Sequence, residues 1–158
     1  MYIHYIYAMK IEDAIKQTKG FNNLTEKVVV NIQYTSSWLN LINNEMFSPY
    51  ELSLQQYNIL RIIRGQKGKS VTVKFLISRM LDKSSNASRL IDKLYAKKYV
   101  TREQCNSDRR RVDIYITELG LKTLKEIDEL NNEVLQKTIK LTDKEADQLS
   151  NLLDKLRG

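Results

Sequence analysis

Residues 84–120, SSNASRLIDKLYAKKYVTREQCNSDRRRVDIYITELG, decide the fold because they join a helical pattern to a basic hairpin. In the first half, apolar residues recur at the spacing of one buried helical face: Ala87, Leu90, Ile91, Leu94 and Tyr95. Two predicted strands, residues 99–102 and 112–116, then flank a turn that carries Asp108, Arg109, Arg110 and Arg111. A helix followed by a basic hairpin is the winged helix-turn-helix arrangement, and it predicts binding to duplex DNA.

The helix predicted over residues 84–98 has short polar and basic side chains on or near the side opposite its apolar face: Ser85, Asn86, Ser88, Arg89 and Lys93. Short side chains let a helix lie deep in the major groove, while Arg and Lys reach base edges and phosphates. We therefore expect a recognition helix here. Ser84 or Ser85 has a second interpretation, as the residue that only caps the helix.

The residues before this helix complete a helix-turn-helix. Ser53 and Gln56 have the spacing of a capping box, which opens a helix that stops near Gly65. Thr72 is expected to cap a shorter helix, and a turn at residues 82–84 joins it to the recognition helix. The expected buried residues of these two helices are Leu54, Tyr57, Ile59, Leu60 and Ile63, then Phe75, Leu76 and Met80.

Further amphipathic helices are predicted on both sides of this core. A short helix falls within residues 9–19, and a longer one runs from a cap at Asn22 or Asn23 to residue 44. After the hairpin, Thr117 caps a helix, and Thr142 with Glu145 forms a second capping box. Their apolar stripes are Leu121, Leu124, Ile127, Leu130, Val134 and Leu135, then Ala146, Leu149, Leu153 and Leu156. A compact core over residues 52–119 leaves these stripes uncovered, so we expect residues 9–44 and 120–158 to form a homodimer.

Length and charge agree with this interpretation. The 158 residues suffice for one domain, residues 1–158, and one proline and five glycines favour long helices. Residues 60–111 hold fifteen Lys and Arg against four Asp and Glu, whereas the remainder carries a net charge of −4. Because the positive charge coincides with the helix and hairpin pattern, a polyanionic partner is favoured over a merely solvated surface.

Several other classes of protein are disfavoured. The single cysteine, Cys105, excludes an internal disulfide and a cysteine-based zinc site, and it fits a cytoplasmic location. The opening MYIHYIYAMK predicts neither a signal peptide nor a membrane span, and Met9 is a plausible alternative start. With one histidine and without a phosphate-binding loop, the chain is not expected to be an enzyme or to hold a cofactor or metal.

The order of these segments resembles the MarR family of dimeric winged-helix transcriptional regulators. The matching segments are LSLQQYNILRII at residues 52–63, SNASRLIDKL at 85–94, YVTR at 99–102 and DRRRVDIYITELG at 108–120. In that family, an Asp-x-Arg wing motif lies nine residues before the Thr that opens the next helix. Asp108, Arg110 and Thr117 keep this spacing.

The resemblance implies roles for matching positions. Arg110 would enter the minor groove from a wing at residues 103–113, and Asp108 would hold the wing by an ion pair. Many relatives bind a small aromatic or lipophilic effector in a cleft, for which Tyr34, Trp38 and Tyr57 are candidates, although such aromatics also suit a core. This chain departs from the family at Lys98, where a left-handed Gly is common, and in a wing without Gly, where Asn106 is the best turn former.

Two alternatives stay open. The winged helix could instead serve protein contacts, with its basic wing on an acidic partner. The chain could also be a thiol-based redox-sensing regulator that uses Cys105, because Arg102 and Arg109 nearby would lower the pKa of its thiol.

Overall fold

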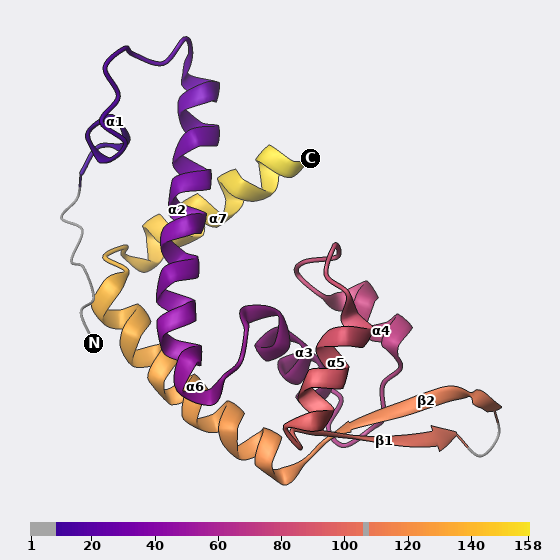
Figure 1. Ribbon diagram of the computed structural model, residues 1–158. Coiled ribbons are helices and arrows are strands. Elements are labelled where there is room, and N and C mark those ends of the chain that lie inside the picture. The colour runs from indigo at the N-terminus through magenta and orange to yellow at the C-terminus, as the bar shows by residue number, and fades with distance from the viewer. Residues whose placement is uncertain (1–8, 106–107) are drawn as a thin grey trace.

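The computed structural model describes residues 9–105 and 108–158, with the backbone alone for Cys105 and Asp108–Arg110. Long helices lie on one side of the molecule and a small core with a projecting hairpin on the other (Figure 1). The chain is thus mainly α-helical with one small β-hairpin, as predicted. Its elements are α1 (Ile11–Ala14), α2 (Leu24–Phe47), η1 (Ser48–Tyr50), α3 (Leu54–Arg64), α4 (Val73–Arg79), α5 (Ala87–Ala96), β1 (Val100–Cys105), β2 (Asp108–Ile116), α6 (Glu118–Thr138) and α7 (Asp143–Arg157).

Side-chain caps open most of these helices where the sequence predicts them. Ser53 and Gln56 form the expected capping box at α3, and Thr142 with Glu145 forms another at α7. The side chains of Asn23, Thr72 and Thr117 accept hydrogen bonds from the backbone N–H three residues on. Each cap satisfies a helix N–H group that has no partner within the helix.

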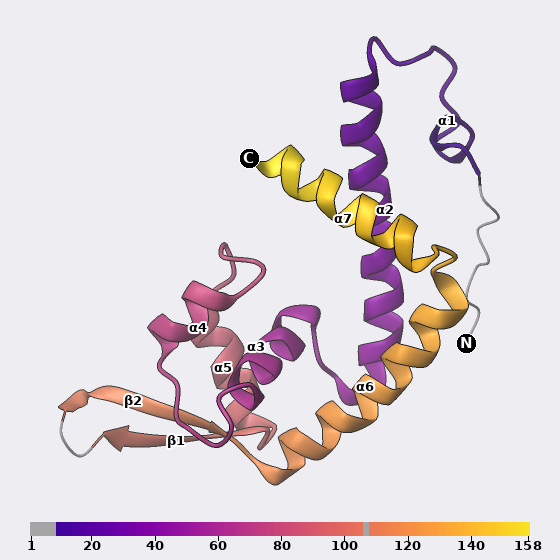
Figure 2. The ribbon, with the colours of Figure 1, turned by 180° about the vertical axis from the view of Figure 1, so that it is seen from behind.

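The N-terminal region differs from the prediction in length. The helix expected within residues 9–19 is only the four-residue α1, and Lys16 soon after it has a left-handed backbone with φ of 53°. Helix α2 continues to Phe47, beyond the predicted end, and Pro49 then lies in the short helix η1. Figure 2 shows α6 leading from the base of the hairpin past the lower end of α2 to α7.

The hairpin is longer than predicted, and the prediction that Asp108, Arg109, Arg110 and Arg111 form its turn is wrong. All four lie in β2, which pairs antiparallel with β1 from Val100↔Ile116 to Cys105↔Asp108, with a register shift after Gln104. A ribbon that projects from the core has both faces in water, so charged residues do not prevent strand pairing there. Asn106, the predicted turn former, lies outside the described residues.

The core lies where α3, α4, α5, the hairpin and α6 meet. It follows the predicted apolar faces in α3, α4 and α5, with two exceptions: Tyr95 is 52% exposed, and Gln56 is buried. In α6, Thr123 is also buried, whereas Leu121 and Leu135 of the predicted stripe are exposed. The fully buried side chains are Phe47, Ile59, Leu60, Ile63, Leu76, Ile91, Leu94, Val100, Ile114, Leu124 and Ile127.

The C-terminal end of α5 keeps the left-handed geometry although Lys98 replaces the common Gly. The φ of Lys98 is 62°, and the N–H groups of Lys98 and Tyr99 donate to the carbonyls of Tyr95 and Leu94. This pair of bonds is a Schellman motif, which closes the helix and turns the chain into β1. A non-glycine residue in this conformation costs about 1 kcal/mol, and the chain tolerates that cost.

Gly120 allows the first turn of α6 to pack closely against the chain that leads into β1. A Cβ atom at this position would lie 2.5 Å from the Tyr99 carbonyl oxygen and 2.8 Å from Cγ1 of Ile116. Gly120→Ala is therefore expected to lower the free energy of unfolding by about 1–3 kcal/mol through overpacking. Urea unfolding at one fixed protein concentration measures this loss. Gly20→Ala, which adds a methyl group in open space, is the control, and equal midpoints for the two variants would refute this packing.

Candidate nucleic-acid interface

The turn before α5 is fixed by one carboxylate. Asp82 accepts hydrogen bonds from the backbone N–H of Ser84 at 2.9 Å and from the hydroxyls of Ser84 and Ser85 at 2.6 and 2.7 Å. These bonds, from Ser84 and then Ser85, lower the pKa of Asp82 to about 2. Because they favour the charged carboxylate, the turn keeps its ionised anchor throughout the neutral pH range.

Asn86 caps α5, which corrects the alternative that Ser84 or Ser85 is the cap. Its Oδ1 accepts from the Arg89 backbone N–H at 3.1 Å. The two serines before it are equally good cap residues, so residue type alone does not identify Asn86 as the cap. Asn86 remains exposed, so its amide nitrogen can still donate to a ligand.

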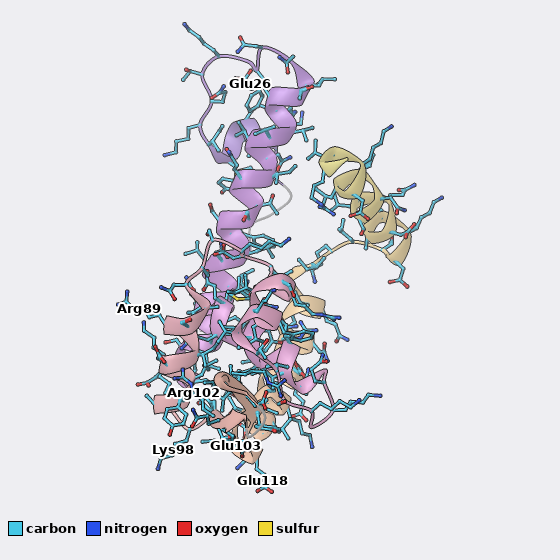
Figure 3. The ribbon with its side chains drawn as sticks, turned by 90° about the vertical axis from the view of Figure 1, so that its right-hand side faces the viewer. Glu26, Arg89, Lys98, Arg102, Glu103 and Glu118 are labelled. Atoms are coloured by element: carbon cyan, nitrogen blue, oxygen red, sulfur yellow. The ribbon has the colours of Figure 1, made fainter. Side chains whose placement is uncertain are left out.

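The predicted groove-facing residues of α5 divide into two groups. Ser88 and Arg89, in the first turn, are exposed, as is Lys93 one turn later, and Figure 3 shows Arg89 at the outer surface. Ser85 is half-buried, and its hydroxyl is bound to Asp82. Lys97, just after α5, is paired with Glu51, with its Nζ 2.5 Å from the Glu51 carbonyl oxygen and 3.1 Å from Oε2. The exposed surface for a groove is therefore the side of α5 that carries Ser88, Arg89 and Lys93.

Arg102 on β1 connects the hairpin to α5, a contact that the sequence did not reveal. Its Nη2 lies 2.5 Å from Oδ1 of Asp92, and its Cζ lies 5.3 Å from the centre of the Tyr95 ring. The Tyr95 ring thus packs against a guanidinium and not against the apolar core. Asp92 and Tyr95 lie on α5 and Arg102 lies on β1, so no fixed spacing in the sequence predicts this contact.

The outer part of the hairpin carries the predicted wing residues. Arg111 is exposed, and its Nη2 lies 3.2 Å from Oδ2 of Asp113. The backbone of β2 places Asp108, Arg109 and Arg110 at the end of the hairpin that projects from the core (Figure 1). Their side chains, the ion pair expected of Asp108, and the thiol of Cys105 all lie outside the described part of the structure.

Of the three aromatic candidates for an effector cleft, Tyr57 lies at a polar recess. Its hydroxyl donates to Oδ1 of Asp128 at 2.9 Å, and Arg64 Nη1 lies 2.5 Å from Oδ2 of the same carboxylate. Burial, then the hydrogen bond to Asp128, raises the pKa of Tyr57. Tyr34 and Trp38 instead lie half-buried on α2, outside this lining. The recess encloses about 250 Å³ and is lined by Tyr57, Arg61, Arg64, Asp128, Asn131 and Asn132.

Comparison with known proteins gives a consistent match. The MarR family model matches residues 52–112, which covers α3 to the middle of β2. An uncharacterized HTH-type transcriptional regulator of Bacillus subtilis, YpoP, is 36% identical over 107 residues, or 67% of this chain and 74% of YpoP. None of the helices that the structure describes is long and apolar enough to cross a membrane.

Solved structures share the fold. A cysteine-to-serine mutant of MarR from E. coli, complexed with operator DNA, aligns with a TM-score of 0.72 at 24% identity, covering 87% of this chain and 99% of that one. The organohalide-sensing regulator RdhR, in its 2,4-dichlorophenol-bound form, gives a TM-score of 0.77 at 21% identity, covering 89% of this chain and 86% of that one. These likenesses establish the winged-helix fold.

Proposed function

Since this chain belongs to the MarR family of transcription regulators, we propose that it acts as a homodimer that reads an inverted repeat in duplex DNA. The observation that carries this proposal is the exposed side of α5 with Ser88, Arg89 and Lys93, beside a hairpin whose second strand holds three consecutive arginines. Helix α5 would lie in the major groove, and the hairpin would reach the adjacent minor groove. As a regulator of genes, the protein is expected to work in the cytoplasm.

The dimer proposal rests on apolar surface that the single chain leaves in solvent. Leu149, Leu152 and Leu156 on α7 are 47%, 64% and 52% exposed, and Leu24 and Leu41 on α2 are also exposed. Figure 3 shows α7 standing apart from α2 and from the core. A helix that contributes so little burial to its own chain gains stability when a second chain covers its apolar side. Two-fold symmetry would then present two copies of α5 to two half-sites.

We further propose that a small aromatic or lipophilic effector controls DNA binding from the region around Tyr57, with Tyr34 and Trp38 as the weaker candidates. The recess lies between α3 of the core and α6 of the dimerisation region, so a ligand there would contact both parts. The similar fold of RdhR, which binds 2,4-dichlorophenol, supports an effector of this kind. An effector that displaced the Tyr57 or Arg64 contact with Asp128 would loosen α3 from α6.

Selection of bound fragments from the source genome tests the main proposal. The fragments should share an inverted repeat with half-sites about one helical turn apart, and binding should fall steeply with salt as counterions are released. If the fragments shared no repeat, or if binding hardly changed with salt, an acidic protein partner for the hairpin would become the better explanation.

The hairpin arginine supplies a second, local test. Arg110→Ala is expected to weaken binding to the selected repeat by about 1–3 kcal/mol per subunit, because one arginine contact in a groove is lost. The control is Lys137→Ala on α6, where Lys137 pairs with Glu133 far from the basic segment. A fluorescence anisotropy titration at fixed salt compares the two, and equal effects would remove Arg110 from the interface.

A further inference from the structure

The contact between α5 and β1 places an acid within the DNA-binding surface. Asp92 lies on α5 between Arg89 and Lys93, and its side chain is 62% exposed. The Arg102 side chain is 30% exposed, and its guanidinium lies 2.5 Å from Asp92 and over the ring of Tyr95. Figure 3, which looks toward the hairpin, shows Arg102 and Glu103 below Arg89. On charge alone, Asp92 should weaken DNA binding and Arg102 should strengthen it, because phosphates repel the carboxylate and attract the guanidinium.

The hairpin is held to the core at its base. It is a two-stranded ribbon in which Val100 and Ile114 are buried, and Ile114 also forms a bridge with Val71. Two-stranded ribbons are marginal by themselves and twist readily. Val100 and Arg102 lie on the same face of β1, which is turned toward α5. Leu94 and Val100 are buried together in the core, and Arg102, two residues further along β1, contacts Asp92 and Tyr95. This contact therefore joins α5 to the part of the hairpin beyond its buried base.

We propose that Arg102 is a positioning residue, which acts through Asp92 and Tyr95 to fix the hairpin relative to the recognition helix. This inference rests on the proposed DNA-binding function. A symmetric dimer must fit two helices and two hairpins to successive grooves at once, so an error in this angle is repeated in both halves of the site. Asp92 therefore strengthens specific DNA binding although its charge is of the wrong sign for a phosphate.

The sign of the Asp92→Asn effect separates positioning from charge. If charge alone acts, Asp92→Asn tightens binding, Arg102→Gln weakens it, and the double variant is close to wild type. If Arg102 positions the hairpin, each single variant binds the selected repeat more weakly, by roughly fivefold or more. The double variant is then no weaker than the weaker single variant, because the same contact is lost in all three.

Glu103→Gln is the matched control, because, like Asp92→Asn, it removes one exposed carboxylate, here from β1. Glu103 faces Asp113 across the hairpin, so this change relieves repulsion and should leave binding equal to or slightly tighter than wild type. Asp92→Glu keeps the carboxylate and should restore most of the affinity. The midpoint of thermal unfolding of each variant should stay close to that of wild type, since the Asp92–Arg102 ion pair lies at the surface.

The experiment is an anisotropy titration of the full-length variants on the selected repeat at several salt concentrations. Positioning predicts weaker binding for Asp92→Asn with an unchanged dependence on salt, because no phosphate contact is lost. Tighter or equal binding by Asp92→Asn would overturn the inference. So would a shallower salt dependence for Arg102→Gln, which would make Arg102 a phosphate contact. If the wild-type protein shows no preference for any duplex, the proposed function itself fails. That result is distinct from the two variant results, which overturn only the positioning role of Arg102.

Discussion

Replacing Leu149 and Leu153 with glutamate is expected to convert the protein to monomers and to weaken binding to its DNA site by about a hundredfold or more. Leu149 is 47% exposed in the single chain, and Leu153 on the same stripe is half-buried. In a packed dimer both would be covered, and two buried carboxylates without partners are strongly unfavourable. A monomer keeps one recognition helix, so it loses the second half-site.

Light scattering at micromolar concentration measures this change directly. Wild type should give about twice the 18.5 kDa chain mass, and the double variant should give the single mass or precipitate. The control adds the same two charges to the other side of α7, as Gln148→Glu with Asn151→Glu, and should remain dimeric. A wild-type protein that is monomeric under these conditions contradicts the dimer proposal, whereas a dimeric double variant would move the interface away from α7.

Replacing Arg89 with alanine is expected to remove much of the preference for the selected repeat while binding to scrambled duplex persists. Arg89 is exposed in the first turn of α5, where a recognition helix contacts base edges. One good base contact is worth about 1–3 kcal/mol, and a symmetric dimer makes it twice. Competition between the selected repeat and scrambled duplex measures the ratio of the two affinities.

Lys93→Ala is the control for Arg89. Lys93 lies one turn further along α5 and is expected to contact phosphate, so its loss should lower both affinities alike. An Arg89→Ala variant with the same pattern would show that Arg89 is a phosphate anchor and that α5 is placed differently in the groove.

The elements that the sequence predicts well are those specified by neighbouring residues. Helix starts at Asn23, Ser53, Thr72, Thr117 and Thr142 follow from a cap and the N–H group it satisfies, all within four residues. Buried faces follow from helical spacing. At Lys98 the residue type does not predict the left-handed end of α5, which the Schellman bonds require whatever the side chain.

The features that were missed depend on residues far apart in the chain or on solvation. Tyr57 and Asp128 are 71 positions apart, and Arg64 and Asp128 are 64 apart, so no local pattern connects them. Tyr95 has the helical spacing of a core residue in α5. In the structure its ring packs against the Arg102 guanidinium from β1, and the residue is 52% exposed. The length of the hairpin was underestimated because charged residues in a solvated ribbon resemble a turn.

The central claim is that a dimer reads sequence through α5 and the hairpin, and a wild-type titration on two duplexes tests it most directly. Protein is titrated by anisotropy into the selected inverted repeat and into a scrambled duplex of equal length and composition, at one physiological salt concentration. We expect two chains bound per repeat and a preference for the repeat of roughly a thousandfold or more. Equal affinity for the two duplexes, or saturation at one chain per repeat, would contradict it.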